Sequence, residues 1–580
     1  MRTTPYACLA AWLCLCAAGA QAQTPAQREI GAEAAQAQQR RALEREAEQQ
    51  RRLQPRPDVR LPTATAPAEG RLPKDEAPCF VIRRVALSNV QGGPLSPFDW
   101  LAAELAGPDG SDPPQGRCLG ARGVAQLIER AQHALVARGF VTTRVFAPPQ
   151  DLSGGDLALQ VLPGRIRAIR FAEPISARAT ALNALPMGPG DVLNLRDIEQ
   201  ALENFKRVPT ADASIEIVPA EGEQDGPGLS DLVITWRQDQ RFRVSLGLDD
   251  GGSRATGRYL TGLTVSHDHA LTLNDLFYVT LQRDLGGGKA GWRGTRGATA
   301  HYSLPLGYWL LGFNAGRQRY YQTTTGPWQN VVYSGWSQHQ DIGVSRLVHR
   351  DAISKTTLSF KAFARQSNNY VEDLELPGQQ RRVGGWELGI GHRAYLGDAV
   401  LDLNLAYKRG TGAFGSRPAL EEARGEGTSR LQLTSIGAGL QRPFDLAGRP
   451  WRYSGNLRAQ FHHTPLTPQD RFAIGGRYTV RGFDGELSLS GDSGWLVRNE
   501  ISTALGQSGA SIYAGLDHGE VRGPSSAFLI GRRLTGAVLG LRGSVGRTQY
   551  EFFVGTPVRK PQGFRTSNTT AGFQFYWQLL

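Results

Sequence analysis

Two short glycine-rich segments near the C-terminal end carry an arginine and an aspartate that could pair. Arg481 lies in GGRYTVRGFDGE (residues 475–486), and Asp517 lies in GLDHG (residues 515–519). A guanidinium can donate two parallel hydrogen bonds to a carboxylate, a geometry that lysine cannot copy. The flanking glycines allow a sharp turn and a close approach between two backbones. The alternative is that two charges share one wet cavity and never meet.

Both segments belong to a long stretch of alternating apolar and polar residues, from about residue 242 to residue 580. Strict alternation predicts β-strands. The clearest runs are Phe242, Val244, Leu246 and Leu248; Phe277, Val279 and Leu281; and Leu401, Leu403 and Leu405. The length from residue 239 onward suits a transmembrane β-barrel of about 16 strands. A charge in such a barrel avoids lipid, so Arg481 and Asp517 are predicted to face the lumen.

The first residues predict export. Arg2 gives a basic start, residues 6–18 are apolar, and Ala20-Gln21-Ala22 is a small-residue cleavage site. The apolar segment is too short to span a bilayer. Residues 1–22 are therefore predicted to be a cleaved signal peptide.

The mature chain keeps two cysteines, Cys79 and Cys118, because the other three lie in the signal peptide. A pair of cysteines in an oxidising compartment predicts a disulfide. Closing that loop is worth about 4 kcal/mol in the chain-entropy description. Two unrelated buried thiols are the alternative.

The mature N-terminus is rich in Ala, Gln, Glu and Arg, which predicts a helix over residues 23–53. That helix has no wide apolar stripe, so it is either exposed to solvent or lodged in a wet cavity, where it could plug a pore. A disordered leader fits the composition equally well. Residues 54–77 are rich in proline and predict an extended linker.

Two small α+β modules follow, over residues 78–163 and 164–238, with the same order of strand, two helices and two strands. The first predicts strands at 80–87, 141–146 and 156–162 and helices at 98–105 and 124–135; the second predicts strands at 164–171, 213–220 and 231–237 and helices at 177–185 and 198–205. Such a sheet has an exposed edge that could accept an extended segment of another chain. The alternative is that the modules are only spacers.

The formal net charge of +12 and the pI near 9.6 do not predict nucleic-acid binding, because the basic residues are spread along the chain. A solvated lumen and loops beside anionic lipid account for them.

Several segments look like parts of enzyme sites but lack the rest. Residues 491–495, GDSGW, resemble a protease nucleophile loop without a matching histidine motif, and residues 286–289 lack the spacing of a nucleotide-binding loop. Two histidine pairs lack further ligands at metal-site spacing: His267 with His269, and His462 with His463. We therefore predict no catalytic residue, metal or cofactor, and no enzymatic activity.

Together these features resemble the two-partner secretion transporters, the TpsB family. The resemblance covers signal peptide, leading helix, linker, two polypeptide-transport-associated (POTRA) modules, barrel and both glycine-rich motifs. It implies that the sixth extracellular loop, at about residues 463–495, folds into the lumen. Its tip would be Val480, Arg481, Gly482 and Phe483, and Arg481 would pair with Asp517 between Gly515 and Gly519.

The resemblance also implies a function. The chain would lie as a monomer in the outer-membrane lipid of a Gram-negative bacterium, with its POTRA modules in the periplasm. It would bind the N-terminal secretion domain of a specific exoprotein, an adhesin or a haemolysin, and translocate it without ATP while the leading helix leaves the lumen. One alternative is an assembly insertase for outer-membrane proteins, against which the two POTRA modules and the leading helix count. The other is a non-specific porin, which leaves the POTRA modules unexplained.

Overall fold

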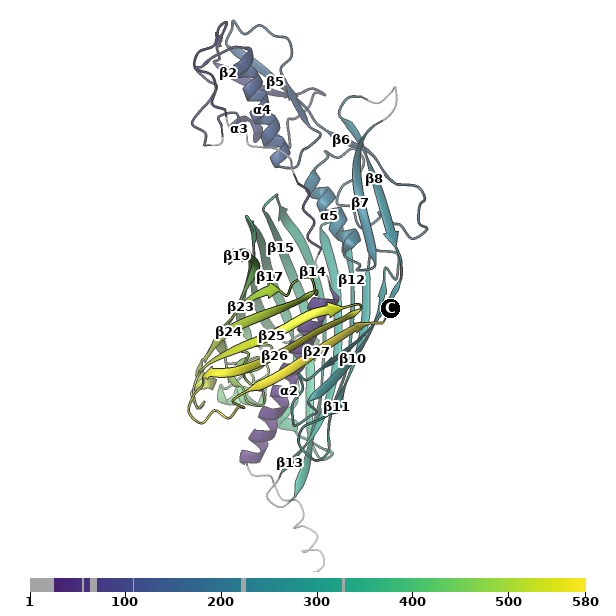
Figure 1. The fold of residues 1–580 in the computed structure, drawn as a ribbon, viewed down its shortest axis with the longest axis vertical. Helices are drawn as coiled ribbons and strands as arrows, with labels where there is room; N and C mark the ends of the chain where they lie inside the picture. The colour runs from purple at the N-terminus through teal and green to yellow at the C-terminus, as the bar shows by residue number, and fades with distance from the viewer. Residues whose placement is uncertain are drawn as a thin grey trace, which may run out of the picture.

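The computed structural model describes residues 25–54, 57–62, 70–107, 109–220, 226–325 and 329–579. The predicted signal peptide lies outside these residues, as does part of the predicted linker. Two small α+β modules extend from one end of a β-barrel, and a helix runs through the barrel (Figure 1). Among the described helices, none combines the length and the apolar character needed to cross a membrane.

The barrel is closed and antiparallel, and the prediction of about 16 strands is confirmed. Every strand pairs with its neighbour along the chain, and the last pairs back with the first. In the described residues the wall strands are β9 (Phe242–Asp249), β10 (Tyr259–Asp268), β11 (Leu276–Gly286), β12 (Arg293–Leu306), β13 (Trp309–Thr325), β14 (Asn330–Arg350), β15 (Ser354–Val371), β17 (Arg381–Leu396), β18 (Ala399–Thr411), β19 (Gln432–Leu446), β20 (Arg449–His462), β23 (Ser493–Ala504), β24 (Ala510–Arg522), β25 (Arg533–Val545), β26 (Thr548–Arg559) and β27 (Thr570–Gln578), with the two-residue β16 (Leu374–Glu375) beside β15.

The two faces of the wall differ in the way that the alternation predicts. On β11, Leu281 is 54% exposed on the outer face, whereas Thr280 is fully buried. Thr264 on the paired strand β10 is buried beside Thr280, and their hydroxyls are 2.9 Å apart. The outer face therefore suits lipid, and the inner face is polar.

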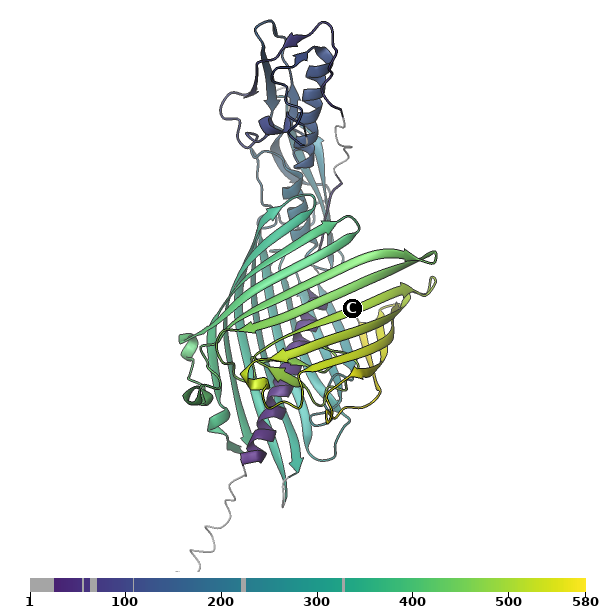
Figure 2. The same ribbon diagram turned by 90° about the vertical axis from the view of Figure 1, so that its left-hand side faces the viewer.

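A long helix, α2 (Pro25–Leu53), crosses the lumen between the strands (Figures 1 and 2). The side chain of Gln49 donates to Thr280 of the wall at 3.2 Å. At the end nearest the small modules, Leu53 is buried against Tyr278. The mostly polar surface of the helix thus faces a polar wall, which explains why it has no apolar stripe.

The first small module has a three-stranded sheet in the order β2-β5-β4, covered by α4. Its elements are β1 (Phe80–Val81), β2 (Arg84–Asn89), α3 (Leu101–Glu104), β3 (Cys118–Leu119), α4 (Ala121–Ala137), β4 (Arg144–Phe146) and β5 (Asp156–Leu162). Cys79 and Cys118 form a disulfide, with their Cα atoms 5.2 Å apart. The helix predicted at 98–105 is shorter than expected, because turns flank α3 on both sides.

The second module has a sheet in the order β6-β8-β7 with one helix against it. Its elements are β6 (Arg165–Phe171), α5 (Leu195–Lys206), β7 (Ala211–Pro219) and β8 (Leu229–Gln238). The helix predicted at 177–185 is wrong, because this segment forms turns. Its polar groups bond to the barrel instead: Asn183 donates to the carbonyl of Pro305 at 2.8 Å. Pro186, which follows the segment, further disfavours helix there.

Candidate functional site

The candidate site is the long segment between β20 and β23, residues 463–492, which we call loop 6. It contains a short hairpin, β21 (Phe472–Ile474) paired with β22 (Leu489–Gly491), and it folds against the inner wall. Val480 at its tip is fully buried against wall residues Leu496 and Leu534. Loop 6 therefore fills part of the lumen.

Arg481 at the tip makes three hydrogen bonds to Asp517 on β24. Its Nε donates to Oδ2 at 2.7 Å, its Nη2 donates to Oδ1 at 2.9 Å, and its backbone N–H donates to Oδ2 at 3.0 Å. Asp517 is fully buried and Arg481 is 6% exposed. A charge-assisted bidentate pair that is shielded from water holds the tip in a single orientation.

A second carboxylate, which the sequence analysis missed, completes the site. Arg481 Nη1 donates to Oε2 of Glu500 on β23 at 2.6 Å, and Arg542 of β25 binds Oε1 of the same residue at 2.8 Å. Arg498, two residues before Glu500 on the same strand, lies 3.7 Å from Asp517. Two charged residues two positions apart on a predicted strand share its inner face, and this spacing could have identified Glu500 as a lumen residue.

The glycines allow the loop tip to approach the wall closely. Gly482 has φ +92°, and a Cβ there would lie 2.5 Å from the carbonyl oxygen of Thr556. A Cβ on Gly515 would lie 2.5 Å from Nη2 of Arg481, and one on Gly519 would lie 3.0 Å from Val480. The residues singled out in the two motifs are thus brought together around one contact.

Two further wall glycines, Gly536 on β25 and Gly555 on β26, also make room for the tip. A Cβ on Gly536 would lie 1.9 Å from the carbonyl oxygen of Arg481, and one on Gly555 would lie 2.8 Å from the Cα of Gly482. Phe483 packs beside this contact against Phe564, with ring centroids 5.8 Å apart. Neither glycine stands out among the 70 glycines of the sequence.

The base of loop 6 is fastened separately. Arg365 of β15 donates to Asp470 at 2.6 Å. Asp492 accepts from the backbone N–H groups of Leu466 at 3.1 Å and Ser525 at 2.9 Å. These contacts hold the ends of the loop, whereas Arg481 holds its tip.

Ser493 of the GDSGW segment lies beside a histidine that the sequence analysis did not connect with it. The hydroxyl of Ser493 lies 2.6 Å from Nδ1 of His462 and accepts the backbone N–H of His462 at 3.0 Å. These contacts join the end of β20 to the start of β23, where loop 6 leaves and rejoins the wall.

Helix α2 contacts loop 6 from the lumen side. Arg40 donates to the carbonyl of Pro468 at 2.9 Å, and Arg41 donates to the carbonyl of Gly485. Glu46 of the same helix bonds to His339 of β14 at 3.0 Å. The helix therefore bridges loop 6 and the wall.

A closed antiparallel barrel with a polar lumen, an inward-folded loop and two appended α+β modules defines an outer-membrane barrel protein with periplasmic POTRA modules. Residues 80–164 match the POTRA domain of ShlB type, and residues 165–219 match a second POTRA domain. Residues 228–543 match the haemolysin secretion/activation protein family ShlB/FhaC/HecB. The chain belongs to this family, as the predicted resemblance to TpsB transporters implied.

Individual relatives agree. The chain is 37% identical over 92% of its length to the outer membrane transporter CdiB-2 of Burkholderia pseudomallei, covering 94% of that protein. It is 26% identical to the hemolysin transporter protein ShlB of Serratia marcescens, over 83% of each chain. The solved structure of CdiB from Acinetobacter baumannii matches with a TM-score of 0.83 and 31% identity, covering 94% of this chain and 99% of that one.

The chain is therefore an outer-membrane transporter of a two-partner secretion system. It is a pore that translocates an exoprotein, and its POTRA modules lie in the periplasm. The insertase and porin alternatives are set aside.

Proposed function

We propose that the Arg481–Asp517 pair holds loop 6 in the arrangement that secretion of the exoprotein requires. Three hydrogen bonds from one residue to a fully buried carboxylate support this role. Such a contact is bistable, because a partly broken pair leaves a charge buried without its partner. Loop 6 is then either docked or released, and this property suits a pore that must widen for its client.

The exoprotein enters through its N-terminal secretion domain, which adds an extended segment to a free edge of a POTRA sheet. The order β6-β8-β7 leaves β7 with one paired neighbour, and its nine residues make it the longest edge strand among the described residues of the two modules. An edge strand offers unpaired N–H and C=O groups to an incoming chain. Contacts made by alternate side chains of this client segment would then determine which exoprotein binds.

Helix α2 plugs the resting pore and leaves the lumen when the client arrives. Its contacts with the wall include hydrogen bonds between uncharged polar side chains, such as Gln49 to Thr264 at 3.3 Å and Gln50 to Asn314 at 3.4 Å. Water can replace bonds of this kind at low cost. The protein works as a monomer in outer-membrane lipid, without ATP or enzymatic chemistry.

The client is of the kind carried by the CdiB transporters rather than by the haemolysin transporters. The identity to CdiB-2 of Burkholderia pseudomallei, 37%, exceeds the 26% and 23% found for ShlB and for HpmB of Proteus mirabilis. Client choice follows the transporter surface, which changes with sequence divergence.

Secretion measured in cells tests the proposal. The exoprotein encoded beside this gene is expressed with the native transporter, Arg481→Ala or Asp517→Ala, and barrel abundance in the outer membrane is measured in parallel. We expect both variants to assemble and to lose export. Full export by both variants at normal abundance would refute the role of the pair, and Arg481→Lys tests whether charge without the bidentate geometry suffices.

A further inference from the structure

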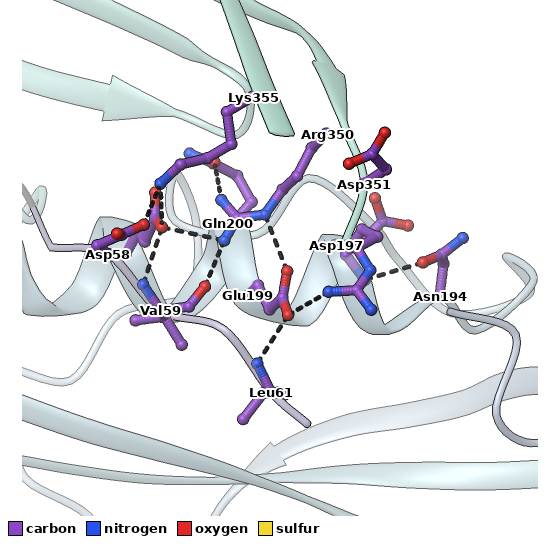
Figure 3. A network of polar contacts seen from close by, with 12 residues as sticks. Asp58, Val59, Leu61, Asn194, Asp197, Glu199, Gln200, Arg350, Asp351 and Lys355 are labelled. Carbon is purple, nitrogen blue, oxygen red and sulfur yellow. Dashed lines mark hydrogen bonds and ion pairs between the residues drawn. The ribbon is translucent and has the colours of Figure 1, made fainter. Parts of the chain in front are cut away.

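The linker after α2 is fastened where the second POTRA module meets the periplasmic rim of the barrel (Figure 3). The backbone N–H of Val59 donates to Glu203 at 3.0 Å, and that of Leu61 donates to Glu199 at 2.8 Å. Both carboxylates belong to α5. Arg350, at the rim end of β14, donates to the carbonyl of Val59 at 2.6 Å. The linker backbone is thus held from both sides.

The linker side chains extend these contacts along the rim. The carboxylate of Asp58 accepts from Nζ of Lys355 at 2.7 Å, lies 3.4 Å from Nη1 of Arg393, and accepts from the hydroxyl of Tyr395. Arg60 stacks over the Tyr395 ring, 4.0 Å from its centroid. Burial opposes ionisation of Asp58, but the bonds from Lys355 and Tyr395 outweigh it and lower the pKa of this carboxyl.

The same carboxylates also join α5 directly to the rim. Arg350 Nε donates to Glu199 at 3.0 Å, and Lys355 donates to Glu203 at 2.9 Å. The side chains of Arg350 and Glu199 are only 3% and 1% exposed. Each carboxylate therefore serves a linker N–H and a rim cation together. Moving α5 away from the rim breaks the linker contacts at the same time.

The length of chain between the helix and this junction is short. The connection from Leu53, where α2 ends, to Asp58 spans at most about 18 Å when fully extended. The 29 residues of α2 make a helix of about 43 Å. The helix cannot withdraw along its axis into the periplasm by its own length while Asp58 stays at the rim.

We propose that residues 58–61 form a clasp that retains α2 in the lumen, and that displacement of α5 from the rim opens it. A client that docks on the second POTRA module and shifts α5 would thereby release the helix. This inference rests on the proposal that α2 plugs the pore and must leave it.

The test uses a variant that changes only the linker, Asp58→Asn with Val59→Pro. The first change removes the carboxylate charge, and the second removes the N–H that Glu203 accepts. The direct ion pairs between α5 and the rim keep all their groups. Asp75→Asn is the matched control, since Asp75 lies in the same linker and is exposed.

Two measurements on the full-length protein report on the helix. Spin labels at Ala47→Cys on α2 and Asp398→Cys in the β17–β18 turn, both exposed positions, report the distance between helix and rim. Cys79 and Cys118 are disulfide-bonded and do not take the label. Single-channel recording in planar bilayers reports the open fraction, and deletion of residues 25–53 gives the fully unplugged reference.

We expect the linker variant to raise both the displaced-helix population and the open fraction by about fivefold or more, whereas Asp75→Asn leaves both unchanged. If the deletion opens the channel but the linker variant changes neither quantity, the clasp is wrong and the plug stands. If the deletion leaves conductance unchanged, the plug fails, and the spin-label distance alone decides whether the linker retains the helix.

Discussion

The carbonyl oxygen of Arg481 lies where a side chain on Gly536 would begin, since a Cβ there would be 1.9 Å from that oxygen. The contact is with backbone, so neither partner can rotate away. Docking of loop 6 therefore requires two features. One is the ion pair with Asp517, and the other is the absence of a side chain at Gly536 on the neighbouring strand β25.

The first prediction follows from this contact. Gly536→Ala should prevent docking of the loop tip, and it should reduce secretion on the order of tenfold or more, because overpacking a tight contact costs about 1–3 kcal/mol. The barrel strand itself tolerates alanine. Gly312→Ala is the control, because a Cβ there has no neighbour within 4 Å in the described structure. Secretion of the exoprotein relative to barrel abundance measures the effect; equal secretion by both variants would contradict it.

The second prediction ranks the two carboxylates that bind Arg481. Asp517→Asn should destabilise the docked loop more than Glu500→Gln, because Asp517 accepts three hydrogen bonds from Arg481 and Glu500 accepts one. Loss of one partner of a shielded ion pair costs about 3–5 kcal/mol, and lumen water reduces that figure. Hydrogen exchange over residues 475–486 measures the loss of docking. Faster exchange in Glu500→Gln than in Asp517→Asn would reverse the ranking.

A double-mutant cycle sharpens the same prediction. Arg481→Ala and Asp517→Ala together should cost little more than either alone, because each single change already removes the pair. Additive effects on hydrogen exchange would mean that the two side chains act independently.

The architecture could be predicted because it depends on patterns with a fixed period. The alternation of apolar and polar residues in segments such as 277–281 predicted the barrel strands, and the 3.6-residue period over 124–135 predicted α4. The helix predicted at 177–185 is wrong because the apolar residues of this segment follow a helix-like pattern, whereas its polar groups bond to the barrel, as Asn183 does to Pro305. Tertiary contact overrides local preference there.

The site could be predicted only in part. Arg481 and Asp517 stood out because charge is costly in a barrel wall. Gly536 and Gly555 did not, since the need for a missing side chain arises from how loop 6 lies across β25 and β26. The clasp could not be predicted from the sequence either, because Asp58 and Lys355 are 297 residues apart along the chain.

The third prediction concerns the disulfide of the first POTRA module. Cys79→Ser with Cys118→Ser should destabilise that module by about 2–4 kcal/mol and leave the barrel unaffected. We expect the loss of stability near the start of α4, where Glu76 accepts the backbone N–H groups of Gly120 at 2.9 Å and Gly123 at 3.0 Å. Without the disulfide the segment carrying Glu76 is free to leave the helix.

Hydrogen exchange separates the two parts of the molecule. Exchange over residues 118–124 should accelerate in the double serine variant, and reduction of the native protein should reproduce that change. Unchanged exchange in both cases would show that the disulfide adds no stability to the folded module.

The last prediction is a pH dependence at the joint between the second POTRA module and the barrel. His269, in the turn between β10 and β11, is fully buried, accepts the N–H of Asn274 at Nδ1 (2.9 Å) and contacts the carbonyl of Arg178 at Nε2 (2.8 Å). These partners require a neutral ring that donates from Nε2. Burial, with the charge of Arg178, lowers the pKa of His269 below 6.5, against the opposing effects of that carbonyl and of Asp275.

The lowered pKa gives the direction of the change. The joint has its full stability above the unfolded-state pKa of about 6.5, and this stability declines as the pH falls toward and through the folded-state pKa. Intrinsic amide exchange slows as the pH falls, so the protection factor is the quantity to compare. Protection factors over residues 269–275 should therefore fall as the pH is lowered from 7.5 to about 5. His269→Asn is the control, because asparagine tolerates the φ of 58° and does not titrate. An identical fall in the protection factors of that variant would assign the pH dependence to another group.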